Sequence, residues 1–151
     1  MKRFRFPLRP VAVLRAHREL RAREAFAAAV HVYVQAEERL AATRARAAEL
    51  AAALFAGRGG TFLAADAASA FRSYRAECEE VVQDERAMIE AKAVMNKKRD
   101  EYLEANRQLK VVERLEEKAR ANHRFETNRA EQAVLDEFAG YRSTTRRPVF
   151  S

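Results

Sequence analysis

The stretch Ala51-Ala52-Ala53-Leu54-Phe55-Ala56-Gly57-Arg58-Gly59-Gly60 carries the only cluster of glycines in the chain, directly after an alanine-rich run. No proline occurs between Pro10 and Pro148. Inside a helix, proline costs about 3 kcal/mol and glycine about 1 kcal/mol relative to alanine, so a stretch without them favours helix. Glycine after a helix C-terminus adopts the left-handed conformation without a Cβ clash. The sequence therefore predicts an all-α fold, a long two-helix antiparallel coiled-coil hairpin that reverses at 57–64.

The predicted helices cover about residues 11–56 and about 65–140, within a single domain of residues 1–151. Either Thr61 or Asp66 can cap the second helix, because each has a side-chain oxygen that accepts a hydrogen bond from a backbone N–H. Apolar residues make up 48% of the chain, but 32 residues are alanines, which bury little surface. The composition is typical of a long helix or a coiled coil, without a thick globular core.

Apolar residues recur every seven positions in both predicted helices, which is the pattern of coiled-coil packing. The first helix has one such row and a companion row three residues later, formed by Phe26, Tyr33, Leu40, Ala47 and Leu54 and by Ala29, Ala36, Thr43 and Leu50. The second helix has the row Tyr74, Val81, Met88, Met95, Tyr102 and Leu109, with the predicted companions Phe71, Cys78, Glu85, Lys92, Arg99 and Asn106. The second companion row is half polar, which predicts weak packing away from the reversal.

The two predicted helices differ in length. A reversal centred near residue 60 pairs Val11 with Leu109, so the stretch from Lys110 to Ala139 extends past the pairing as an overhanging C-terminal helix. A lone helix is marginal in water. Its end carries a cluster of large apolar residues, Val134, Leu135, Phe138 and Tyr141. An exposed cluster of this kind predicts a binding surface.

Charge is concentrated at the two ends of the chain. Residues 1–23 carry a net charge of +7 and residues 142–151 carry +3, whereas residues 24–141 carry −3. A hairpin brings both ends to the same pole. We therefore expect the terminal end to bind an acidic surface, whether of protein, nucleic acid or anionic lipid.

The sequence lacks the motifs that would support catalysis or metal binding. There is no phosphate-binding glycine loop, and His17, His31 and His123 have no histidine or cysteine three or four positions away. Carboxylate pairs such as Glu79-Glu80 fall on helical faces without a pocket. A two-helix fold also lacks the concavity that a substrate needs. We expect a non-enzymatic protein with no cofactor and no metal.

Other features concern the cellular compartment. The one cysteine, Cys78, excludes an intramolecular disulfide framework and fits a reducing environment. The sequence has no run of 18 apolar residues, so it predicts no transmembrane segment. The basic start around Phe4 and Phe6 lacks the apolar stretch of a signal peptide. The alternative to a protein partner is a basic coiled coil that binds nucleic acid or an anionic membrane, but no known nucleic-acid-binding motif accompanies the charge.

Four stretches resemble the FliJ family, the small coiled-coil proteins of the bacterial flagellar type III export apparatus. They are Lys2-Arg3-Phe4-Arg5-Phe6 at the start, Gln35-Ala36-Glu37-Glu38-Arg39-Leu40, Lys110-Val111-Val112-Glu113-Arg114-Leu115-Glu116, and the run from Glu126 to Ala139. The resemblance covers nearly the whole chain. It implies a fold like the central stalk subunit of rotary ATP synthases. A place in the related virulence-type secretion systems remains the other option within this class.

The resemblance also implies partners. The terminal end of the hairpin is expected to enter the hexameric ring of the export ATPase FliI, and the part nearer the reversal to contact the export gate FlhA through its cytoplasmic region, with export chaperones as further partners. The implied location is cytoplasmic, at the inner face of the inner membrane at the flagellar base. The ATPase-binding residues carried over are Asn128, Arg129, Gln132, Leu135, Asp136, Glu137 and Phe138. The gate-binding residues are Arg39, Thr43, Leu50, Tyr74, Cys78 and Val81.

Overall fold

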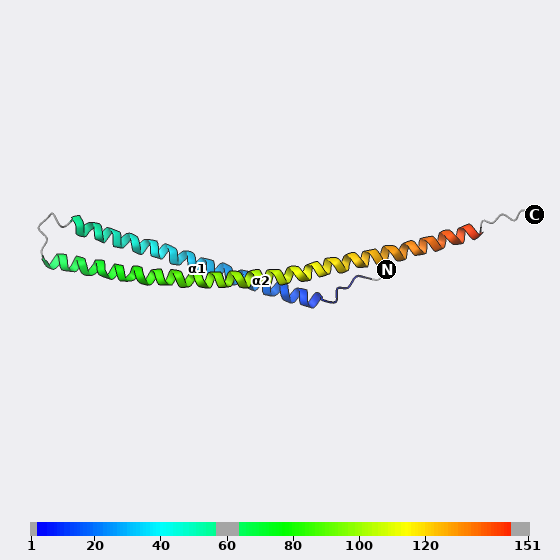
Figure 1. Cartoon of the computed structure of the whole chain (residues 1–151), viewed down its shortest axis with the longest axis horizontal. Coiled ribbons are helices and arrows are strands. Elements are labelled where there is room, and N and C mark those ends of the chain that lie inside the picture. Colours follow the sequence, from blue (N-terminus) through cyan, green and yellow to red (C-terminus); the bar gives the residue numbers. More distant parts are fainter. Residues whose placement is uncertain (1–2, 57–63, 146–151) are drawn as a thin grey trace, which may run out of the picture. The chain divides into compact units, whose positions relative to one another are not determined.

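The computed structural model describes residues 3–56 and 64–145. These residues form two helices, α1 (Arg9–Ala56) and α2 (Ala64–Thr145), and no strand (Figure 1). The predicted all-α fold with two long helices is therefore confirmed. Both helices run slightly longer than predicted, and α2 continues through Gly140.

The reversal predicted at 57–64 falls almost entirely on residues 57–63, which lie outside the described residues together with the candidate cap Thr61. The other candidate cap, Asp66, lies inside the first turn of α2. It is therefore not the residue that precedes the helix, as a cap must be. Its carboxylate is instead placed where negative charge favours the helix dipole.

Contacts divide the chain into two compact units. Unit 1 contains residues 1–18 and 106–151, and unit 2 contains residues 19–105. The two ends of the chain thus belong to the same unit. Unit 1 has sixteen lysines and arginines against seven acidic residues, whereas unit 2 has thirteen against fifteen. The whole positive excess of the sequence therefore lies in unit 1.

In unit 2, α1 and α2 lie side by side and run in opposite directions (Figure 1). The rings of Phe26 and Tyr102 stack with their centroids 6.1 Å apart, and Thr43 bonds to Asp84. The predicted core rows of α1 are buried or half-buried throughout, and so is the row of α2 that begins at Tyr74. The core between the two helices is thin along most of its length, because many of its residues are alanines. Leu40, only 3% exposed, is its best-buried large side chain.

The predicted companion row of α2 is wrong by one residue. Phe71, Lys92 and Arg99 are exposed. The side chains that turn toward α1 belong to the row Ala70, Glu77, Asp84, Ala91, Lys98 and Ala105, of which Asp84 and Ala91 are buried. Phe71 and Cys78 are apolar and suggested the wrong face, whereas the true row follows the Tyr74 row by three residues, as in α1.

The predicted pairing is also wrong, by about two helical turns. A reversal centred at residue 60 would place Thr43 opposite Glu77, but Thr43 lies opposite Asp84. Both arrangements keep the core rows in contact, because they differ by about one heptad. The flanking charges distinguish them. The observed pairing joins Arg44 to Glu85, whereas the other would bring Glu37 toward Glu85 and lose that pair.

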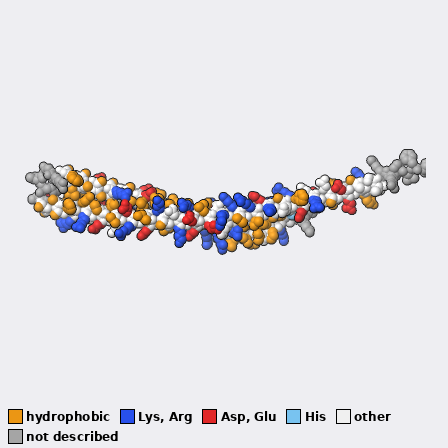
Figure 2. Space-filling view, in the orientation of Figure 1, with side chains coloured by type: hydrophobic (Ala, Val, Ile, Leu, Met, Phe, Trp, Pro, Cys, Tyr) orange, Lys and Arg blue, Asp and Glu red, His pale blue; other side chains and the backbone are white. Residues whose placement is uncertain are grey.

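In unit 1, the first described residues, from Arg3 on, lie along α2. Arg9 forms an ion pair with Glu116 at 3.2 Å, and the Arg15 guanidinium donates to the carbonyl of Gln108 at 3.0 Å. Val112 is only 1% exposed. The stretch of α2 that begins at Lys110 is therefore not a lone helix as predicted. Every described residue from 128 to 145, however, is exposed (Figure 2).

Candidate partner-binding surfaces

The N-terminal segment, residues 3–9, is held against α2 by one aromatic side chain and one ion pair. The Phe4 ring meets the His123 ring edge-on at a centroid distance of 5.4 Å, and the Arg120 guanidinium lies 5.3 Å from the Phe4 centroid. Arg120 also shares the carboxylate of Glu116 with Arg9. A cation over an aromatic face contributes about 0.5–1 kcal/mol at exposed sites. These contacts fix the segment locally on α2.

Beside this segment unit 1 has an open groove. Its walls come from the first described residues and from one face of α2: Arg3, Phe4, Arg5, Ala119, Asn122, His123, Glu126, Thr127, Ala130, Glu131, Val134 and Leu135. The groove mixes apolar carbons with both signs of charge. It therefore has no single chemistry that points to a small ligand.

The apolar cluster at the end of α2 continues the face that the N-terminal segment covers. Side chains at Glu116, His123 and Thr127 are half-buried on that face. At about 100° per residue, Val134, Phe138 and Tyr141 lie on the same face, about two to four turns beyond Thr127. These three residues and Glu137 line a shallow hollow. The side chains of Val134, Phe138 and Tyr141 are 59%, 71% and 75% exposed, respectively. This stripe is an apolar surface in unit 1 that no described residue covers.

The seven predicted ATPase-binding residues are all exposed, but they do not form one face. Phe138 lies on the apolar stripe, with Glu137 at its border. Asn128, Arg129, Gln132 and Asp136 point away from the stripe, because each lies about 100° or more from its centre. Leu135 stands between the two groups and also lines the groove. Two separate surfaces are thus available at this end.

The predicted gate-binding residues belong to unit 2, and most of them pack helix against helix. Thr43 is fully buried, Leu50, Tyr74 and Val81 are half-buried in the core rows, and Cys78 is half-buried next to the core row at Glu77. Arg39 is the exposed member of the set. Only Arg39 therefore presents a whole side chain to a partner in this state.

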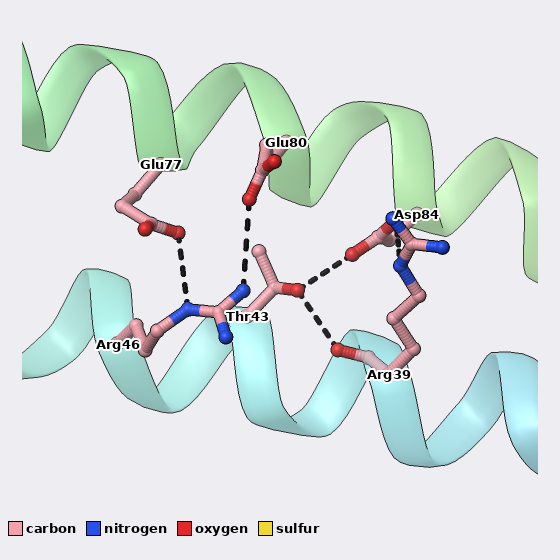
Figure 3. A network of polar contacts seen from close by, with 6 residues as sticks. All are labelled: Arg39, Thr43, Arg46, Glu77, Glu80 and Asp84. Atoms are coloured by element: carbon pink, nitrogen blue, oxygen red, sulfur yellow. Dashed lines mark hydrogen bonds and ion pairs between the residues drawn. The ribbon is translucent and has the colours of Figure 1, made fainter.

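Arg39 takes part in a polar network that joins the two helices (Figure 3). Its Nε lies 3.3 Å from Oδ1 of Asp84, while the Thr43 hydroxyl lies 2.5 Å from Oδ2 of the same carboxylate and 2.8 Å from the carbonyl of Arg39. One turn beyond Thr43, Arg46 forms ion pairs with Glu77 and Glu80. The surface next to Arg39 is thus built from paired charges.

Two tyrosine hydroxyls of unit 2 have raised pKa values. The Tyr33 hydroxyl donates to Oε1 of Glu37 at 2.7 Å, and this hydrogen bond raises the pKa of Tyr33 above its usual value near 10. A side-chain hydrogen bond with Cys78 raises the pKa of Tyr74 in the same direction. Both tyrosines therefore stay neutral at physiological pH. Cys78 is a half-buried free thiol.

Sequence reasoning missed Asp84 and the contact of Phe4 with His123. Asp84 could have been found as the acidic residue three positions after Val81, on the row that follows the Tyr74 row in the heptad pattern. The Phe4 contact had no signal in the periodicity, because it joins an irregular segment to a helix.

The described residues contain no cluster of three or more histidine, cysteine or carboxylate side chains that could hold a metal ion. Neither α1 nor α2, over the part of the chain that the structure describes, has a stretch apolar enough to span a bilayer.

The model of the family described as "Flagellar FliJ protein" matches residues 4–148. The match includes the N-terminal segment, both helices and the apolar stripe. Neither a curated protein nor a solved structure matches the chain. Since the family match spans nearly the whole sequence, the chain belongs to the FliJ family and is a component of the flagellar export apparatus.

Proposed function

We propose that the protein is a non-enzymatic, stalk-like coiled coil that binds the ring of the export ATPase FliI through unit 1 and couples it to the export gate FlhA through unit 2. The exposed apolar stripe of Val134, Phe138 and Tyr141 is the observation on which the ATPase contact depends. Large apolar side chains exposed together on one face mark interaction sites in soluble proteins.

The charge of unit 1 supports the same contact. Its sixteen basic residues against seven acidic ones suit an acidic ring lumen, which would attract this end of the protein over the range of a Debye length, about 8 Å in physiological salt. The apolar stripe would then supply the short-range contact. Long-range charge attraction increases the association rate, whereas apolar burial slows dissociation. Added salt should therefore lower the association rate more than it shortens the lifetime of the complex.

Phe138→Asp tests the ATPase contact in a co-purification with FliI. The substitution places a charge in the apolar stripe, so the complex should be lost while the helical circular dichroism signal stays within a few per cent. Phe125→Asp is the matched control, because Phe125 is 69% exposed and lies on the outer side of α2. Retention of the ATPase by Phe138→Asp would reject the stripe as its binding site.

The gate contact is proposed at Arg39, with the half-buried Leu50, Tyr74, Cys78 and Val81 supporting the surface and the buried Thr43 holding its geometry. Arg39→Glu should weaken capture by the FlhA cytoplasmic domain by about tenfold, since a charge reversal at a contact costs on the order of 1.4 kcal/mol or more. Arg86→Glu, on the outer side of α2, is the control. Export chaperones remain further proposed partners at the cytoplasmic face of the membrane.

The charge of unit 1 also favours a second candidate, binding to nucleic acid or to an anionic membrane. A gel shift with random-sequence duplex and a sedimentation assay with phosphatidylserine vesicles, each over a salt series, test it. Sub-micromolar binding at about 0.15 M salt would support this function, because non-specific binding of a basic protein is usually far weaker there.

A further inference from the structure

A second apolar row runs along α1 of unit 2, outside the core. It consists of the residues that follow the core row by one position, Leu20, Ala27, Val34, Ala41, Ala48 and Phe55. All six are exposed, and none is polar. A position of this kind faces solvent in a two-helix coiled coil and is usually polar. An unbroken apolar row there is the pattern of a helix that packs against two neighbours.

α2 presents apolar side chains on the same side of the pair. The ion pair between Arg44 and Glu85 marks this side, because both residues directly flank the core. Ala41 and Ala48 lie one turn from Arg44, and Val82 and Ile89 lie one turn from Glu85. Val82 and Ile89 are 47% and 61% exposed. We call this surface the Arg44–Glu85 side.

The Arg44–Glu85 side has an excess of positive charge. Its flanking and outer positions carry Arg23, Arg44, Arg75, Lys92 and Arg99, but only Glu37 and Glu85 as acids. The other side of unit 2, marked by the pair of Arg46 and Glu80, has the reverse balance, with Arg21, Arg39, Arg46 and Lys97 against Glu49, Asp66, Glu80, Glu90, Glu101 and Glu104. The two sides of the same helix pair therefore differ in sign.

We propose that the Arg44–Glu85 side of unit 2 binds a third helix, an amphipathic segment of a partner protein whose apolar row is bordered by acidic residues. A helix fits because the exposed apolar residues recur every seven positions, which is the spacing that a neighbouring helix reads. Alanine at three of the six row positions lets helix axes approach closely. Acidic borders fit because they meet the excess of arginine and lysine.

A second copy of this chain fits the surface less well. Two Arg44–Glu85 sides brought face to face would oppose like charge along both borders, which is destabilising. The surface is also separate from the exposed residues of the proposed contacts, although the half-buried Cys78 of the gate contact lies one heptad before Glu85. Arg39 lies on the Arg46–Glu80 side, and the apolar stripe of Phe138 belongs to unit 1. Binding here can therefore succeed or fail independently of the ATPase and gate contacts.

The test uses the full chain and a fluorescent four-heptad peptide with leucine in its core rows and glutamate at both borders. Val34→Lys with Ile89→Lys should weaken binding of this peptide at least tenfold, because both lysines enter the apolar surface. Val32→Lys with Val94→Lys is the matched control. Val32 and Val94 are 55% and 52% exposed and flank the core on the opposite side, so this variant should change the affinity less than twofold.

A peptide with lysine in place of each glutamate should bind the unmodified chain at least tenfold more weakly. Failure of the acidic peptide to bind, or equal loss in the two double variants, would overturn the proposal. Sedimentation of the peptide-free chain adds one further outcome, since a dimer that Ile89→Lys dissolves would make a second copy the occupant and would also overturn it. If Val34→Lys with Ile89→Lys loses helical circular dichroism, Leu103→Lys on the same side replaces it.

Discussion

The hydroxyl of Thr43 lies 2.5 Å from Oδ2 of Asp84, and both residues are buried between α1 and α2. The hydroxyl has one hydrogen, so it donates either to this carboxylate or to the carbonyl of Arg39 at 2.8 Å. The shorter bond has the charged acceptor and is the stronger one. Asp84, in contrast, has Thr43 and Arg39 as the only partners of its oxygens among the described residues. The two residues therefore depend on each other unequally, because Thr43 has a second acceptor for its hydrogen whereas Asp84 needs the Thr43 donor.

This asymmetry predicts that Thr43→Val destabilises the protein more than Asp84→Ala. The first leaves a buried carboxylate short of a donor, which costs about 1–3 kcal/mol, whereas the second leaves a hydroxyl that still has the Arg39 carbonyl. Adding Asp84→Ala to Thr43→Val should then recover stability. Urea unfolding followed by circular dichroism measures all three variants, with Glu90→Ala on the exposed face as the control. A double variant less stable than Thr43→Val would contradict the argument.

Cross-linking tests the register of the two helices. Val32 lies two heptads before Arg46, and Val94 lies two heptads after Glu80, so the pairing of Arg46 with Glu80 places Val32 and Val94 opposite each other. In a Cys78→Ser background, Val32→Cys with Val94→Cys should react within one chain with a short bis-maleimide. Val32→Cys with Ala87→Cys should react far more slowly. Equal yields would show that the chain samples both registers.

Periodicity predicted the core rows of α1 and the Tyr74 row of α2, because burial on one face imposes a seven-residue repeat on a long helix. It could not predict the register, since a slip by one heptad keeps every core row in contact. Charges such as Arg44 and Glu85 break that degeneracy, and they act only once both helices are in place. The contact between Phe4 and His123 follows no repeat, so only the structure reveals it.

The pKa of Tyr33 should report the hydrogen bond that its hydroxyl donates to Glu37. The pKa of Tyr33 is raised because the Glu37 carboxylate accepts a hydrogen bond from the neutral phenol. A raised folded-state pKa contributes stability that is complete below the unfolded pKa, near 10, and is lost as pH rises through the folded value. Glu37→Gln should lower the pKa of Tyr33, measured by ¹³C NMR of its ring. Glu38→Gln should leave it unchanged, and an equal shift in both variants would exclude the hydrogen bond as the cause.

Phe4→Ala should release the N-terminal segment without unfolding the helices. It removes the edge-on contact with His123 and the cation contact with Arg120, together worth about 1–2 kcal/mol. Trypsin should then cut the Arg5–Phe6 bond several-fold faster, while the urea midpoint changes little. Leu8→Ala, at a side chain that is 42% exposed, is the control and should leave the cleavage rate near that of the unmodified chain. Unchanged cleavage of Phe4→Ala would show that Arg9 and Glu116 alone hold the segment.

Glu19 occupies a core position, and its side chain is only 6% exposed. Arg23 binds it through Nε at 3.2 Å and through a second guanidinium nitrogen at 2.7 and 2.9 Å, and this hydrogen bond raises the pKa of Arg23. Replacing a buried charge by an apolar side chain of similar size is often neutral or stabilising, provided that its partner can return to water. The side chain of Arg23 is 58% exposed, so it can do so.

Glu19→Leu should therefore raise the free energy of unfolding by about 1 kcal/mol, measured by urea denaturation. Glu38→Leu, on an exposed face of α1, is the control and should give no such gain. A loss of stability in Glu19→Leu would mean that the carboxylate makes a net favourable contribution.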